Sequence, residues 1–164
     1  MQTIRASVIT CSDAASKGER VDESGPAVRE LLLTHGFAAA DLVVVPDTLE
    51  AISSAIVEAV DRRGARLVVT TGGTGIAPRD LTPEATNRVS DKLVPGFGEA
   101  MRAASLLRTP MAALSRAQAA TRGTALIVNL PGNPKGAQEC LDAVIKLIPH
   151  ALELLAGGKV EKHP

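Results

Sequence analysis

The sequence contains almost no aromatic side chains: Phe37 and Phe97 are present, and tryptophan and tyrosine are absent. Proteins that bind single-stranded nucleic acid stack bases on several exposed rings, so this class is disfavoured. Basic and acidic residues both total 18, and zero net charge gives no long-range attraction to nucleic acid or an anionic membrane. We therefore expect neither as a partner, and any anionic ligand must be held by local groups.

Cysteine and long apolar runs are also scarce. Cys11 and Cys140 are too few and too far apart for a four-ligand zinc site, and we expect ordinary thiols. No apolar run approaches the roughly 20 residues of a membrane span. The first ten residues lack the basic segment and cleavage site of a secretory signal. These absences predict a cytoplasmic protein without disulfides.

Short β-branched segments alternate with longer helical segments, which predicts a single α/β domain over residues 1–164 with a parallel sheet covered by helices. Asp47 can cap the second expected helix, with Glu50 as its capping-box partner. Strands are expected at Ile4 to Thr10, Asp41 to Val45, Ala65 to Thr71 and Ala125 to Leu130. Helices are expected at Pro26 to His35, Thr48 to Arg63, from Thr82 onward, Gly96 to Leu107, and Lys135 to Ala156 with a kink at Pro149.

A glycine-rich segment, Thr70 to Gly75, directly follows the expected central strand. Glycines permit positive φ and let consecutive N–H groups converge on one anion, so a phosphate is the natural ligand. The hydroxyls of Thr71 and Thr74 would add donors. A tight turn that needs glycine only for steric reasons would look the same. The segment lacks the spacing of a Walker loop or a dinucleotide fingerprint.

Two aspartates flank this segment in the expected fold. Asp47 closes the second strand, and Asp80 follows the glycines. If the strands are parallel neighbours, both carboxylates lie at the same sheet edge, where they would repel a polyphosphate unless a divalent cation lay between them. The pattern predicts Mg²⁺ held by one or both of the Asp47 and Asp80 carboxylates together with substrate phosphates. A helix cap for Asp47 and a turn position for Asp80 are the structural alternatives.

The segment from Pro131 to Gly136 joins the last strand to the last helix. It offers a rigid turn, a helix N-terminus and a lysine, all of which suit an anion, although an ordinary turn has the same composition. Cys11 to Gly25 is a polar loop after the first strand, at an edge where α/β proteins bind ligands.

Together these segments resemble the Mog-type molybdopterin adenylyltransferases and the related G domain of gephyrin. The resemblance covers nearly the whole chain. It implies a three-layer α/β/α fold with a mostly parallel sheet, as in molybdenum cofactor biosynthesis proteins, and commonly a homotrimer. The motifs that carry it are Ser12-Asp13, Val45-Pro46-Asp47, Thr70 to Gly75, Arg79-Asp80, Thr82 to Thr86, Pro95 to Met101, Ser115-Arg116 and Leu130 to Gly136.

The resemblance implies transfer of AMP from Mg²⁺-bound ATP to molybdopterin, with pyrophosphate released and the product passed to a molybdenum-insertion protein. It makes Asp47 and Asp80 catalytic, and it places Ser115 and Arg116 near the terminal phosphate of the pterin. The alternatives are a non-catalytic molybdopterin-binding or storage protein and a nucleotide hydrolase of the same fold. The residues expected to bind substrate are Ser12, Asp13, Thr71, Gly72, Gly73, Thr74, Gly75, Glu99, Ser115, Arg116, Pro131, Gly132, Asn133 and Lys135.

Overall fold

The computed structural model describes residues 3–158 and contains one six-stranded sheet in the order β2-β1-β3-β6-β5-β4. The first four strands in that order are parallel, and β5 runs antiparallel to both β6 and β4. The mostly parallel sheet predicted from sequence is therefore confirmed. The strands are β1 (Arg5–Cys11), β2 (Ala38–Val45), β3 (Leu67–Thr71), β4 (Lys92–Leu93), β5 (Gln118–Arg122) and β6 (Ala125–Leu130).

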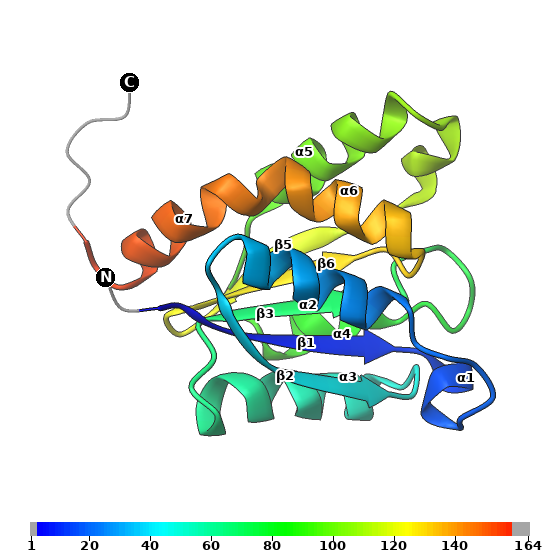
Figure 1. The fold of residues 1–164 in the computed structure, drawn as a ribbon, viewed down its shortest axis with the longest axis horizontal. Coiled ribbons are helices and arrows are strands. Elements are labelled where there is room, and N and C mark those ends of the chain that lie inside the picture. The colour runs from blue at the N-terminus through cyan, green and yellow to red at the C-terminus, as the bar shows by residue number, and fades with distance from the viewer. Residues whose placement is uncertain (1–2, 159–164) are drawn as a thin grey trace.

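Helices cover both faces of the sheet, which confirms the three-layer arrangement (Figure 1). The larger core packs α2, α5, α6 and α7 on one face, and a smaller core packs α3 and α4 on the other. The α-helices are α1 (Asp13–Ser16), α2 (Ser24–Thr34), α3 (Leu49–Val57), α4 (Thr82–Val89), α5 (Pro95–Leu106), α6 (Pro134–Val144) and α7 (Ile148–Leu155). Three shorter helical segments are η1 (Glu58–Arg62), η2 (Pro110–Leu114) and η3 (Ile145–Leu147).

Each central strand is buried because its neighbours pair with it on both edges and helices cover both of its faces. Every residue of β3 and β6 is buried, which explains why their sequences are apolar or β-branched at all positions except Asn129. All four parallel strands point the same way, so the loops after Cys11, Val45, Thr71 and Leu130 share one edge of the sheet. That carboxyl edge carries the candidate site.

The expected helix boundaries need two corrections. Thr48, not Asp47, caps α3, because its hydroxyl accepts the N–H of Ala51 at 3.2 Å. Glu50 lies near Arg88 and does not complete a capping box. The expected C-terminal helix is divided into α6, η3 and α7, and the break falls just before Pro149, whose missing N–H and bulky ring disrupt the preceding turn.

Two strands were absent from the sequence prediction. β5 was missed because its sequence, QAATR, has a single β-branched residue, and β4 because it has only two residues, both exposed. Gly123, with φ +53°, opens the two-residue loop between β5 and β6, and it is the local signal that could have revealed this hairpin. A short helix, α1, also begins the segment expected to be a polar loop.

Candidate active site

The glycine-rich loop after β3 requires glycine at two positions. Gly72 and Gly73 have φ of +91° and +68°. A Cβ at Gly72 would lie 2.3 Å from the carbonyl oxygen of Cys11, and one at Gly73 would lie 2.3 Å from Oγ1 of Thr82. The loop can therefore pass this close to β1 and α4 only without side chains at these positions.

Backbone N–H groups of this loop remain available to a ligand. Gly72 donates its N–H to the carbonyl of Leu130 at 3.0 Å, so this N–H is not available to an anion. Within residues 3–158, the N–H groups of Gly73, Thr74 and Gly75 have no hydrogen-bond partner. The hydroxyl of Thr71 is paired with that of Ser24 at 2.8 Å, which makes it a structural group. The anion-binding role of the loop stays a prediction, now centred on residues 73–75.

The two candidate catalytic aspartates face the same cavity. This acidic pocket has a volume of about 330 Å³ and lies where the loops after β1, β2, β3 and β6 meet. Four carboxylates and one guanidinium line it, so a triphosphate would meet net negative charge unless a cation accompanied it. The charged residues of the acidic pocket are Arg20, Asp22, Glu23, Asp47 and Asp80.

Asp47 is held by its backbone and one carboxylate oxygen. Its Oδ2 accepts the N–H of Asp13 at 2.9 Å, while its own N–H donates to Oδ1 of Asp13 at 3.0 Å. Burial raises the pKa of the Asp47 carboxyl, and the nearby charges of Asp13 and Asp80 act in the same direction. The N–H of Asp13 and the charge of Arg79 oppose this rise. A nearby cation would relieve the cost of ionising Asp47.

The carboxylates of Asp47 and Asp80 fit a magnesium ion. Oδ1 of Asp47 is buried and has no hydrogen-bond partner among the described residues, which leaves it free for a ligand. Oxygen donors are those that Mg²⁺ prefers, usually one or two carboxylates with waters and substrate phosphates. Residues 3–158 contain no cluster of three or more acidic, histidine or cysteine side chains that could hold a metal, so the remaining ligands would come from substrate or water.

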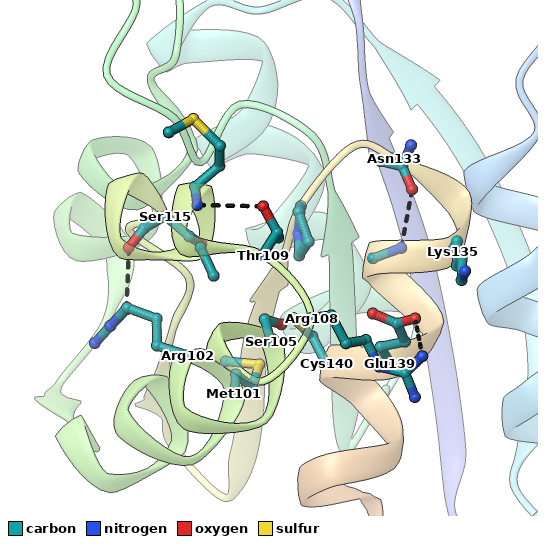
Figure 2. A pocket seen from close by; sticks show the side chains of 14 residues that line it. Met101, Arg102, Ser105, Arg108, Thr109, Ser115, Asn133, Lys135, Glu139 and Cys140 are labelled. Carbon is teal, nitrogen blue, oxygen red and sulfur yellow. Dashed lines mark hydrogen bonds and ion pairs between the residues drawn. The ribbon is translucent and has the colours of Figure 1, made fainter.

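A second cavity of about 490 Å³ lies beside the acidic pocket, and Asn133 lines both. Figure 2 shows this second cavity, which we call the mixed pocket because the apolar side chains of Met101 and Cys140 lie there beside polar and charged ones. Arg108 pairs there with Glu139 at 3.1 Å. A ligand with an apolar ring and an anionic arm could use this combination. Its basic residues are Arg102, Arg108 and Lys135.

Arg116 supports the glycine-rich loop. Its Nε donates to the carbonyl of Gly75 at 2.8 Å, and its Nη2 donates to that of Asp80 at 2.7 Å. Its remaining arm pairs with Glu84, which lowers the pKa of that carboxyl. The guanidinium is thereby committed to protein acceptors, and its predicted contact with pterin phosphate stays a prediction.

Most predicted site residues gather at the carboxyl edge. Asp13 lines none of the described pockets and instead contacts Asp47 and Arg79. Glu99 and Arg116 line a separate shallow hollow with Ser115. The acidic pocket includes Ser12, Asp47, Thr71, Gly72, Gly73, Asp80, Gly132 and Asn133. An adjoining hollow includes Thr74, Gly75, Ser115 and Pro131, and Lys135 lines the mixed pocket.

Sequence reasoning missed three charged residues of the acidic pocket, Arg20, Asp22 and Glu23. Arg20 and Asp22 lie in the loop between α1 and α2, inside the segment expected at the ligand-binding edge, but the sequence singled out neither residue. Asp22 fixes this loop, because it accepts the hydroxyl of Thr10 at 2.8 Å and the N–H of Gly25 at 3.0 Å. An acidic residue three positions before a helical glycine was the available signal. No sequence signal marked Arg20 as a pocket residue, since its place in the pocket depends on how the loop folds.

Both cysteines are free thiols, and the structure buries both of them. Burial raises the pKa of the Cys11 thiol to about 12, and burial also raises that of Cys140. Thiolate is the nucleophilic form, so Cys11 is an inert part of the core despite lying next to Ser12 in the acidic pocket.

The fold and the site define an α/β protein with adjoining ligand-sized pockets at the carboxyl edge of its sheet. The chain belongs to the family described as "probable molybdopterin binding domain", whose model matches residues 7–150.

Similar proteins cover nearly the full chain. A molybdopterin adenylyltransferase of Helicobacter pylori is 45% identical over 98% of this chain and 93% of its own length. That of Escherichia coli is 41% identical over 100% of this chain and 91% of its own length. The crystal structure of the molybdopterin biosynthesis enzyme MoaB of Thermus thermophilus superposes with a TM-score of 0.89 at 47% identity, covering 97% of this chain and 100% of that one. The predicted family is therefore confirmed.

Proposed function

We propose that this protein is a molybdopterin adenylyltransferase, which transfers AMP from ATP to molybdopterin and releases pyrophosphate. The observation that carries the proposal is that Asp47 and Asp80 line one pocket together with Gly73. Gly73 begins the run of three residues whose N–H groups have no hydrogen-bond partner within residues 3–158. The full-length similarity to proteins named molybdopterin adenylyltransferase supports the same reaction. Residues 1–164 form a single domain in this proposal.

In the proposed reaction, a terminal phosphate oxygen of molybdopterin attacks the α-phosphorus of ATP. A new bond forms between that oxygen and phosphorus, the bond from the α-phosphorus to the bridging oxygen breaks, and pyrophosphate leaves with the bonding electron pair. No covalent enzyme intermediate is required. Such chemistry depends on positioning and charge neutralisation rather than on a strong base.

The chain would position both substrates along the carboxyl edge. The N–H groups of residues 73–75 would donate to phosphate oxygens of ATP, and Asp47 and Asp80 would hold Mg²⁺. When bound, Mg²⁺ neutralises charge on the triphosphate and on the leaving pyrophosphate. The pterin would occupy the mixed pocket, where Lys135 and Arg108 can meet its phosphate. Asn133 lines both cavities, so in this arrangement the pterin phosphate would lie on the side nearest the nucleotide.

Arg20 is proposed to contact the β- and γ-phosphates of ATP. It is the only basic side chain among the described residues of the acidic pocket, and within residues 3–158 its guanidinium has no hydrogen bond or ion pair. We expect Arg20→Ala to raise the KM for ATP about tenfold, since a charge-assisted contact is worth about 1.5 kcal/mol or more. Lys17→Ala is the matched control, because Lys17 lies in the same loop but does not line the pocket. Equal KM values for both variants in steady-state assays would contradict the contact.

The proposed assembly is a cytoplasmic homotrimer that passes its product to a molybdenum-insertion protein. Leu106, Leu107 and Leu114 are exposed near the end of α5 and on η2, and subunit contacts commonly cover apolar side chains of this kind. Within residues 3–158, no helix is both long and apolar enough to cross a membrane.

The test of the proposed function is pyrophosphate release from ATP, measured with and without molybdopterin. Release that depends on molybdopterin and matches the pterin consumed supports adenylyl transfer. Release without molybdopterin would identify a nucleotide hydrolase instead. Tight pterin binding with no release would identify a storage protein.

A further inference from the structure

A bidentate ion pair joins the loop that carries Asp80 to the start of α1. Nε of Arg79 donates to Oδ2 of Asp13 at 2.6 Å, and Nη2 donates to Oδ1 at 3.0 Å. The Arg79 side chain is 62% exposed. Exposed pairs of this kind contribute little to stability, so folding alone does not account for its geometry.

The same aspartate holds the end of β2. Oδ1 of Asp13 accepts the backbone N–H of Asp47, and Oδ2 of Asp47 accepts the backbone N–H of Asp13. These reciprocal bonds leave Oδ1 of Asp47 buried and unpartnered among the described residues. Asp13 therefore fixes which oxygen of Asp47 is available to a ligand.

On the other side of the ion pair, Arg79 and Asp80 belong to one closed turn. Oδ2 of Asp80 accepts the N–H of Ala77 at 2.9 Å, and the N–H of Asp80 donates to the carbonyl of Ala77 at 2.9 Å. Restraining Arg79 thus restrains Asp80 as well. A continuous chain of contacts runs from Asp47 through Asp13 and Arg79 to the turn that carries Asp80.

We propose that Asp13 and Arg79 form a clasp that sets the relative position of Asp47 and Asp80, so that both carboxylates can hold one divalent cation. Asp13 and Arg79 are positioning residues and touch neither substrate. This inference rests on the proposed function for its catalytic consequence. Its structural consequence, the geometry of the cation site, can be measured without turnover.

The test compares Arg79→Gln and Asp13→Asn with the unmodified protein. Replacement of groups that orient metal ligands typically costs about 10-fold to 100-fold in metal affinity or activity. We expect a loss of that size in kcat, and a matching loss in the affinity for Mn²⁺, measured by electron paramagnetic resonance with α,β-methylene-ATP bound. Molybdopterin affinity should remain within about twofold. The melting temperature should remain within about 3 °C, since the Arg79 side chain is 62% exposed and both replacements keep side chains of similar size.

Arg122→Gln and Asp61→Asn are the matched controls. Arg122 forms a similar bidentate pair with Asp61, at 3.0 and 2.6 Å, and neither residue lines a described pocket. These variants should retain the normal kcat and Mn²⁺ affinity. The double variant Asp13→Asn with Arg79→Gln should lose no more kcat or Mn²⁺ affinity than either single variant, because each single replacement already breaks the same ion pair.

Two results would overturn the clasp. One is an Mn²⁺ affinity in the Arg79→Gln and Asp13→Asn variants equal to that of the controls. The other is a loss of molybdopterin binding in Asp13→Asn, which would make Asp13 a substrate contact. If the unmodified protein transfers no AMP but Mn²⁺ affinity falls as expected, the clasp is supported and the proposed reaction is wrong.

Discussion

Asp80→Ala is expected to lower kcat by about 10²-fold to 10³-fold while molybdopterin binding is retained. This expected fall in kcat is the usual cost of losing one preorganised electrostatic contact in an active site. Asp80 lines the acidic pocket, whereas the proposed pterin site is the neighbouring mixed pocket, which Asp80 does not line. Steady-state kinetics and calorimetric titration with molybdopterin measure the two effects separately.

Asp80→Asn separates charge from structure in this prediction. The amide oxygen of asparagine can still accept the N–H of Ala77, so the turn from residue 77 to residue 80 should persist. A comparable loss of kcat in both variants would assign the effect to the carboxylate charge. Normal turnover in Asp80→Ala would refute the catalytic role.

Gly72→Ala is expected to lower the free energy of unfolding by about 3 kcal/mol or more. Positive φ at a non-glycine residue and overpacking each cost about 1 to 3 kcal/mol, and both apply here. The alanine Cβ would lie 2.3 Å from the Cys11 carbonyl oxygen, a backbone atom that cannot rotate away. For a chain of this length the melting temperature should fall by about 6 to 12 °C, as measured by calorimetry.

Gly36→Ala is the control for backbone strain alone. Gly36 has a similar φ of +83°, but a Cβ there would meet no atom within 4 Å. Its melting temperature should fall by clearly less than that of Gly72→Ala. Equal falls in the two variants would show that the close approach of the glycine loop to β1 contributes nothing.

The parallel half of the sheet could be predicted because its strands carry the strongest local signal. Leu67 to Thr71 and Ala125 to Leu130 are apolar or β-branched almost throughout, as buried parallel strands require. β5 gave a weak signal because small alanines at 119 and 120 fill its buried positions. Burial there is set by packing against α5 and α4, which the sequence of β5 alone does not reveal.

The sequence could predict which residues gather at the candidate site, but not the hydrogen bonds that those residues form with one another. Asp47 and Asp80 were expected at one sheet edge, since strand order alone brings the ends of parallel strands together. The exchange of hydrogen bonds between Asp13 and Asp47 joins residues 34 positions apart, and it displaced the helix cap to Thr48. The commitment of Arg116 to the carbonyls of Gly75 and Asp80 likewise depends on tertiary geometry.

The most direct test of the central claim follows AMP from ATP labelled at the α-phosphate into molybdopterin, with Mg²⁺ and then with excess chelator. We predict labelled adenylylated pterin and an equal amount of pyrophosphate. Both should be lost with the chelator, and Asp80→Ala should form both about 10²-fold to 10³-fold more slowly. Molybdopterin that binds but never acquires the label under these conditions would contradict the account.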